Sequence, residues 1–279
     1  MMLLAGLRRP PGATPRCART AVASLAQQQQ QPGSSWHTTQ HGRSRTVYKL
    51  DSMEWLRGGG GSPVSLPHRF NVVTSLPDIS ELRQTTETVA EYEAWFVEAV
   101  RRLLCLTPPS NVAIFYQTPG RFTGEGGAWL DKSTLCMLGA REAGAACVWR
   151  KIALISPPGT RRGGVRPSFV DLLCFSREHR VPRDHVAVDV LPDRGYCAYP
   201  KAMGEAACVA AAEYCQLVDG GLDGGGDEGS GTSGLIVDPF CGYGSMLAVA
   251  NALGMDAVGM DLSARCCRRA AEHVSQVGQ

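Results

Sequence analysis

The chain has 279 residues, of which 44% are hydrophobic and 19% are charged, and this is the composition of an ordinary globular protein. Its net charge of +2 conceals an asymmetry, because residues 1–50 contain seven Lys or Arg and no Asp or Glu, whereas the rest carries 21 basic and 26 acidic side chains. The acidic balance excludes a broadly basic nucleic-acid-binding body, and no apolar stretch approaches the ~18 residues of a membrane span.

Residues 1–45 are rich in Arg, Ala, Ser and Gln and show no hydrophobic periodicity. This composition is typical of a disordered tail, and it is also typical of an organelle transit peptide, which is Arg- and Ser-rich and lacks acidic residues. A transit peptide would direct the protein to a mitochondrion or plastid, and a plain tail would leave it in the cytoplasm or nucleus. One domain is expected over 46–279, with a glycine-rich insertion at 219–234.

Past the tail, strand and helix patterns alternate. Residues 45–56 read as a short strand followed by a helical turn that starts at Asp51. Residues 69–78 form a strand that ends in a Pro-Asp turn. Apolar side chains recur on one helical face over 87–106, and residues 111–117 read as a compact buried strand whose last residues could line a pocket.

The alternation continues to the end of the chain. The predicted elements are a helix at 131–144, strands at 147–154 and 168–176, a helix at 200–218, a strand at 235–238, a helix at 245–253, a strand at 256–261 and a helix from about Ser263. Such an order predicts an α/β fold: a Rossmann-like, mostly parallel sheet with helices on both faces. The eleven cysteines include no C-x-x-C pair, so no metal site is expected.

A glycine turn, DPFCGYGS, spans residues 238–245 between a buried strand and a helix. Gly242 and Gly244 permit positive φ and let a ligand approach the backbone, and the helix that begins near Ser245 presents free N–H groups. The next strand ends in Asp261, whose carboxylate suits the two hydroxyls of a ribose. The spacing fits NAD or another adenosine compound.

Two residues favour a ligand other than a dinucleotide. Leu247 stands where a dinucleotide fingerprint requires Gly or Ala. Asp238, the acid before the glycines, would repel a pyrophosphate, whereas it suits a positive group such as the ammonium of S-adenosylmethionine. An NAD-dependent oxidoreductase is therefore the weaker alternative.

The DPF-x-G-x-G pattern, followed by a strand that ends in an acid, resembles the cofactor-binding motif of S-adenosylmethionine-dependent methyltransferases. The segment order over most of residues 45–275 resembles the permuted (β-type) DNA and RNA amino-methyltransferases, whose catalytic segment precedes that motif. The resemblance implies a circularly permuted methyltransferase fold, S-adenosyl-L-methionine as cofactor, and a nucleic-acid substrate, RNA or DNA. The cofactor-binding residues that it implies are Asp238, Pro239, Phe240, Gly242, Gly244, Ser245 and Asp261, with Asp51 and Lys201 as further contacts.

For two of these residues a plainer role is open. Asp51 either contacts the adenosine or caps the helix that follows it. Lys201, at the expected start of a helix, either faces the methionine carboxylate or is solvated.

Residues 75–78 stand where the family has its D/N/S-P-P-aromatic catalytic tetrapeptide, and here they read Ser75-Leu76-Pro77-Asp78. By the resemblance, Ser75, Pro77 and Asp78 shape the catalytic side, with Ser75 able to accept a hydrogen bond from the target. The aromatic residue that would stack on a flipped base is missing. Asp78 offers a carboxylate that could take the proton of the acceptor, or it could simply cap a turn.

Two alternatives to an active permuted amino-methyltransferase are open, and the altered tetrapeptide motivates the first. One is a catalytically silent methyltransferase-fold subunit that serves a partner. The other is an N2-guanine-type RNA methyltransferase, if the chain is truncated and its catalytic segment lay downstream.

Overall fold

The computed structural model describes residues 34–58, 63–82, 86–121, 129–160, 167–181, 188–220 and 234–277. The first 33 residues of the expected tail lie outside the described residues, as do residues 161–166 and most of the glycine-rich insertion. Within the part of the chain that the structure describes, no helix combines the length and the apolar composition that crossing a membrane requires.

The tail predicted to extend to residue 45 is too long. β1 (Ser35–Gln40) and β2 (Arg43–Lys49) pair antiparallel around a two-residue turn in which His41 and Gly42 both have positive φ. Such turns match the twist of a hairpin. The polar composition of SWHTTQ hid a strand whose half-buried residues alternate with exposed ones.

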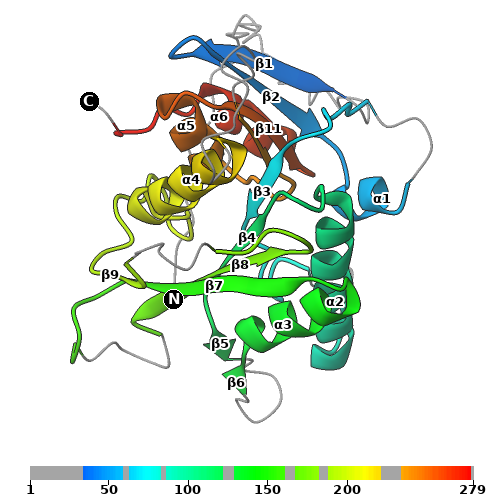
Figure 1. Ribbon diagram of the computed structural model, residues 1–279, viewed down its shortest axis with the longest axis vertical. Coiled ribbons are helices and arrows are strands. Elements are labelled where there is room, and N and C mark those ends of the chain that lie inside the picture. The colour runs from blue at the N-terminus through cyan, green and yellow to red at the C-terminus, as the bar shows by residue number, and fades with distance from the viewer. Residues whose placement is uncertain are drawn as a thin grey trace, which may run out of the picture. The chain divides into compact units, whose positions relative to one another are not determined.

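Among the described residues, nine strands form one sheet in the order β1-β2-β11-β10-β3-β4-β8-β7-β9 (Figure 1). The further strands are β3 (Asn71–Thr74), β4 (Ala113–Gln117), β7 (Ala146–Leu154), β8 (Phe169–Ser176), β9 (Val190–Leu191), β10 (Leu235–Asp238) and β11 (Asp256–Asp261). The five strands from β2 to β4 run parallel, and β8 is antiparallel to both β4 and β7. The predicted mostly parallel α/β sheet is therefore confirmed, and β5 (Gly120–Arg121) and β6 (Trp129–Leu130) form a separate hairpin.

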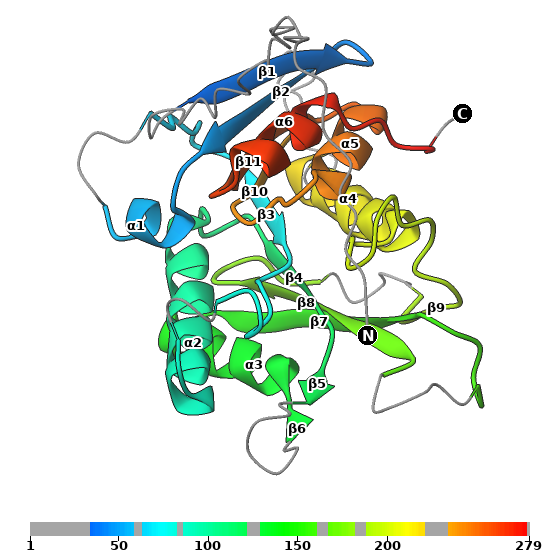
Figure 2. The ribbon, with the colours of Figure 1, turned by 180° about the vertical axis from the view of Figure 1, so that it is seen from behind.

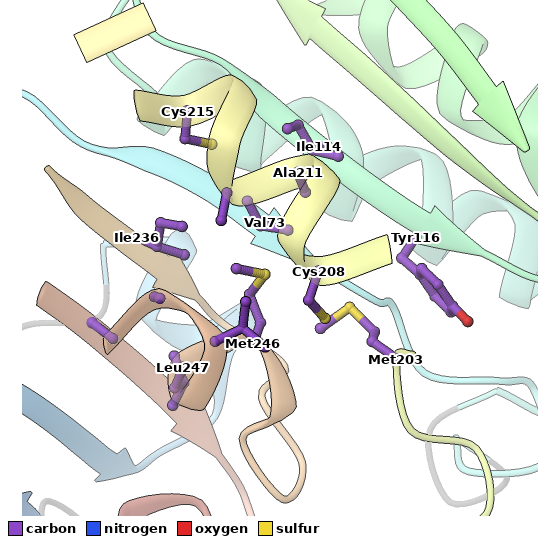
Figure 3. Packing of buried hydrophobic residues seen from close by; sticks show 14 of the residues in the cluster. Val73, Ile114, Tyr116, Met203, Cys208, Ala211, Cys215, Ile236, Met246 and Leu247 are labelled. Atoms are coloured by element: carbon purple, nitrogen blue, oxygen red, sulfur yellow. The ribbon is translucent and has the colours of Figure 1, made fainter. Parts of the chain in front are cut away.

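Helices cover both faces of the sheet (Figures 1 and 2). One layer contains α1 (Ser52–Leu56), α2 (Val89–Leu106) and α3 (Lys132–Glu142), and the other contains α4 (Glu205–Gly220), α5 (Ser245–Ala252) and α6 (Ala264–Glu272). Figure 3 shows Cys208, Ala211 and Cys215 of α4 beside Val73 and Ile114 of the sheet. Several thiols thus serve as small apolar core residues.

Local signals explain where the helices begin. Thr88 and Glu91 form a capping box at the start of α2, and Asp131 caps α3 through the backbone N–H groups of its first turn. The helix predicted from residue 200 begins only at Glu205. Lys201 has a φ of 72°, which is incompatible with a right-handed helix, so it belongs to the preceding loop.

Candidate active site

The carboxyl ends of β3 and β10 lie side by side, because the two strands are neighbours and run parallel. Their last residues are joined directly: the hydroxyl of Thr74 donates to Asp238 Oδ1 at 2.6 Å. The glycine turn leaves the sheet after Asp238, and the segment Ser75–Asp78 leaves it after Thr74. Two segments more than 160 residues apart in sequence therefore start at the same edge of the sheet, the edge at which open α/β sheets bind ligands.

Asp238 is fully buried, and its two oxygens differ. Oδ1 accepts hydrogen bonds from Thr74 and from the Phe240 N–H at 3.2 Å, whereas Oδ2 has no partner among the described residues. Burial raises the pKa of Asp238 from its ordinary value of 3.8 to about 7, although the Thr74 hydrogen bond opposes the shift. A buried acceptor without a donor is costly, so this oxygen suits a cationic or N–H-bearing ligand group.

The two glycines of the turn are needed for different reasons. Gly242 and Gly244 have φ of 52° and 79°, a region that favours glycine. A Cβ on Gly242 would meet only the Tyr199 hydroxyl, at 3.3 Å, so this backbone stays accessible. A Cβ on Gly244 would come within 2.8 Å of Ala270, and the structure therefore assigns Gly244 to the packing of α6 against the turn.

Helix α5 begins at Ser245, which is buried, and its N-cap Gly244 provides no side-chain cap. The first N–H groups of the helix therefore remain available to a ligand. Leu247, which breaks the dinucleotide fingerprint, packs against Gly259 of β11, where a Cβ would lie 2.5 Å from the leucine side chain. The close approach of helix and strand is thus achieved by a glycine on the strand.

Asp261 ends β11, the strand next to β10, so its carboxylate lies at the same edge of the sheet. Its Oδ1 accepts from the Ser263 N–H at 2.7 Å, and burial raises its pKa above the ordinary range. The hydroxyl of Ser52 at the start of α1 donates to the Pro239 carbonyl, which ties α1 to the glycine turn. Asp51 itself is exposed and caps α1 through Met53 and Glu54, as its plainer role predicted.

A loop ahead of α4 reaches the glycine turn through Tyr199, a residue that the sequence analysis missed. Its hydroxyl accepts from the Tyr243 N–H at 3.2 Å, and the two rings lie 4.5 Å apart. Burial raises the pKa of Tyr199 to about 12. Two residues further on, exposed Lys201 pairs with Glu81 at 3.2 Å. No local pattern marks Tyr199, because its contact depends on how a long loop folds back.

The segment after β3 is held by contacts on several sides. Leu76 is buried in the core, Tyr92 of α2 donates to the Pro77 carbonyl at 3.0 Å, and the Asp78 N–H donates to Glu81 at 2.8 Å. The Asp78 carboxylate accepts from the ammonium of Lys132 rather than capping a turn. Ser75 is half-buried beside these groups.

Lys132 is the second site residue that sequence reasoning missed, since 54 positions separate it from Asp78. The sequence did contain a signal for Lys132: a cation in the first turn of a helix interacts unfavourably with the helix dipole, so its presence there suggests another role.

Gln117 ends β4, next to β3, and is buried, and its Nε2 has no partner among the described residues. Nowhere in the described part of the chain do three His, Cys, Asp or Glu side chains gather to hold a metal ion.

Solved structures share this architecture. TTHA0409 of Thermus thermophilus, a candidate DNA modification methylase in complex with S-adenosyl-L-methionine, aligns with a TM-score of 0.58 and 16% identity over 81% of this chain and 91% of its own. The cytosine-N4-specific PvuII DNA methyltransferase aligns with a TM-score of 0.57 and 13% identity, over 87% of this chain and 89% of its own. M1.HpyAVI in complex with SAM aligns with a TM-score of 0.54 and 11% identity, over 82% of this chain and 98% of its own.

At these identities the likeness establishes the fold. No protein-family model and no curated protein matches the sequence.

Proposed function

We propose that the chain is an S-adenosylmethionine-dependent methyltransferase of the permuted amino-methyltransferase type, acting on nucleic acid. The observation that carries the proposal is the buried Asp238, whose free Oδ2 lies at the edge of the sheet where Ser75–Asp78 also begins. Methyl transfer requires a donor site and an acceptor site in contact, and under this proposal the edge would supply both. The fold likeness to TTHA0409 and M1.HpyAVI, both determined with this cofactor, supports the choice of donor.

The residues at the edge fit the cofactor. Asp238 Oδ2 would accept from the methionine ammonium, and the free N–H groups at the start of α5 with Ser245 would face the methionine carboxylate. Asp261 would bind the ribose hydroxyls, while Pro239, Phe240 and Gly242 would form the wall of the site. Asp51 and Lys201 are proposed further contacts, although the structure already gives the first a cap and the second an ion pair with Glu81.

When bound, the cofactor supplies a methyl group on a positively charged sulfur. The chain's own contribution is to align the acceptor with the C–S bond and to keep water away, which is how positioning lowers a barrier. Ser75 would accept a hydrogen bond from the acceptor, Pro77 would hold the bend, and Asp78 would receive the departing proton. RNA and DNA both carry bases with N–H groups that could accept a methyl group, so both are candidate substrates.

The test uses tritium-labelled S-adenosylmethionine with total RNA, sheared genomic DNA and a protein extract as separate acceptors. Label is expected in a nucleic-acid fraction with the wild-type chain. Asp78→Asn should lose transfer and retain cofactor binding, and Asp238→Asn should lose both. Label that appears only in the protein fraction would contradict the nucleic-acid assignment.

A silent partner subunit is the second candidate, favoured by the missing aromatic residue and by the ion pair that already engages Asp78. Cofactor binding without transfer to any fraction would support it. An N2-guanine-type enzyme would need its catalytic segment after Asp261, whereas Ser75–Asp78 already begins beside the glycine turn. This arrangement favours the permuted amino-methyltransferase type, in which the catalytic segment precedes the glycine turn.

A further inference from the structure

A buried ammonium lies directly behind the proposed acceptor side. Lys132 is the first residue of α3, and its side chain is 4% exposed, whereas the side chain of its partner Asp78 is 46% exposed. The ion pair therefore runs from the interior to the surface. Removing an ammonium from water costs free energy that an ion pair does not fully repay, so the burial of Lys132 needs an explanation.

The helix itself does not require Lys132. Asp131 already caps α3 by accepting from the Ser133 and Thr134 N–H groups at 3.0 and 3.3 Å. A cation in this turn is unfavourable with respect to the helix dipole. The ammonium is instead directed at Asp78, which indicates that its role concerns that carboxylate.

The backbone around Asp78 is fixed independently of Lys132. Tyr92 holds the preceding carbonyl, and Glu81 accepts from the Asp78 N–H. Lys132 donates to Oδ1 of Asp78, and no hydrogen bond from another described residue reaches Oδ2. The arrangement leaves one carboxylate oxygen, in a defined orientation, for an incoming group.

A second set of hydrogen-bonded polar side chains holds the first turn of α3 against the sheet. Ser133, the neighbour of Lys132, donates to the buried Asp171 of β8 at 2.8 Å, and Arg150 of β7 donates to the other oxygen of Asp171 at 2.8 and 2.9 Å. Because Asp171 ties the first turn of α3 to the sheet, Lys132 is anchored to a rigid element.

We propose, on the basis of the proposed methyltransferase function, that Asp78 is the proton acceptor of the reaction and that Lys132 is its positioning residue. The electron pair of an acceptor N–H or O–H atom forms the new bond to the methyl carbon, and the C–S pair stays on sulfur, which becomes a neutral thioether. The acceptor's proton passes to Asp78 Oδ2 and then to solvent, to which Asp78 is partly exposed. Lys132 holds the carboxylate in place and takes no proton.

The test measures initial rates with labelled S-adenosylmethionine and the RNA or DNA fraction that the wild type labels most. The variants are Lys132→Met, Lys132→Arg, Asp78→Asn and the double variant Lys132→Met/Asp78→Asn. Lys132→Met and Asp78→Asn should each lower kcat at least 30-fold, with KM for the fraction within 3-fold and the cofactor Kd within 2-fold. The double variant should be no slower than the slower single variant, because both remove the same function.

Lys132→Arg keeps the charge and should retain at least a tenth of the wild-type kcat. Arg101→Met, which breaks a half-buried ion pair with Glu98 on α2, away from the proposed site, is the control and should change nothing. Thermal unfolding of each variant checks folding. If Lys132→Met does not fold, the kcat values of Asp78→Asn and Lys132→Arg are compared instead. Asp78→Asn is suited to this because it changes the more exposed member of the ion pair.

A kcat of Lys132→Met within 3-fold of wild type, or losses that multiply in the double variant, would overturn the proposal. An arginine variant as slow as Lys132→Met would also overturn it. If the wild type binds the cofactor and labels no fraction, Asp78 and Lys132 have no such role, although the cofactor site stands. If it binds no cofactor, the proposed function itself fails, and this inference fails with it.

Discussion

Gly244 at the start of α5 lies against Ala270 of α6, so closely that a Cβ on the glycine would be 2.8 Å from the Cα and Cβ of the alanine. The glycine turn is therefore clamped between the sheet and α6. Gly244 affects the site indirectly, because its lack of a side chain lets α6 pack closely against the turn. Gly242, in contrast, leaves its own backbone accessible to a ligand.

The two glycines should respond differently to alanine. Gly244→Ala adds a clash with a backbone to a φ of 79°, so we expect the free energy of unfolding to fall by about 3 kcal/mol or more. Gly242→Ala faces a φ of 52° and only the Tyr199 hydroxyl, so the loss should be about 1–2 kcal/mol. Urea denaturation of both variants measures the difference, and equal losses would contradict the clamp.

Asp238→Asn should stabilise the chain without ligand at alkaline pH. Below about pH 4 the carboxyl is protonated in both folded and unfolded chains and contributes nothing. Between about pH 4 and its folded pKa of about 7, only the unfolded chain has lost the proton, so stability falls as pH rises. Above pH 7 the full penalty is present, on the order of 4 kcal/mol for a shift of about three pH units.

Thermal unfolding across pH 4.5–8.5 tests this linkage. The asparagine variant should have a Tm close to that of the wild type near pH 4.5 and several degrees higher at pH 8.5. A gap that does not change with pH would show that Asp238 is not the group responsible.

Thr74→Val should weaken cofactor binding in a pH-dependent manner. The Thr74 hydroxyl lowers the pKa of Asp238, so its removal raises that pKa further and leaves less carboxylate at pH 7. We expect the Kd for S-adenosylmethionine to rise about 10-fold or more at pH 7, since one hydrogen bond to a charged group is worth about 1.5 kcal/mol or more. The difference in Kd between Thr74→Val and the wild type should be smaller at pH 8.5, and Thr74→Ser should have a Kd close to that of the wild type. Isothermal titration calorimetry measures these values.

Among the described residues, Arg45 has the largest fully buried polar side chain, and it lies away from the site. It is fully buried and donates to the Asn251 side chain at 2.8 Å and to the Ala270 and His273 carbonyls at 2.9 and 2.7 Å. Burial lowers its pKa to about 10. These bonds satisfy carbonyls at the end of α6 that no helical N–H can reach.

Arg45→Met should therefore lower the free energy of unfolding by about 2–4 kcal/mol, because several buried acceptors lose their donor. Arg265→Met on α6 replaces an exposed guanidinium and should stay within about 0.5 kcal/mol of the wild type. Guanidinium chloride denaturation of the pair gives the comparison. A loss below about 0.5 kcal/mol for Arg45→Met would mean that its hydrogen bonds contribute no net stability.

Local patterns were enough to predict the main helices and strands, the mostly parallel sheet, and the glycine turn with Asp261. These features depend on periodicity, capping and spacing, which short stretches encode. The hairpin strand Ser35–Gln40 was missed because it is polar, and the late start of α4 followed from the left-handed φ of Lys201.

The rest of the site could not be predicted because it depends on long-range contacts. Lys132 meets Asp78, Tyr199 meets Tyr243, and Arg45 meets the end of α6 across 54, 44 and more than 220 positions. Such pairs form only once the sheet brings the segments together. Their side chains carry no periodic signal of their own.

We propose that the edge formed by β10 and β3 binds a sulfonium donor through Asp238. The most direct test is isothermal titration of S-adenosylmethionine into wild type and Asp238→Asn at pH 8. We predict one site per wild-type chain and a 10- to 100-fold weaker Kd for the variant, since a charge-assisted hydrogen bond contributes about 1.5–3 kcal/mol. Equal affinity in the two proteins, with both shown to be folded, would mean that Asp238 does not bind the donor.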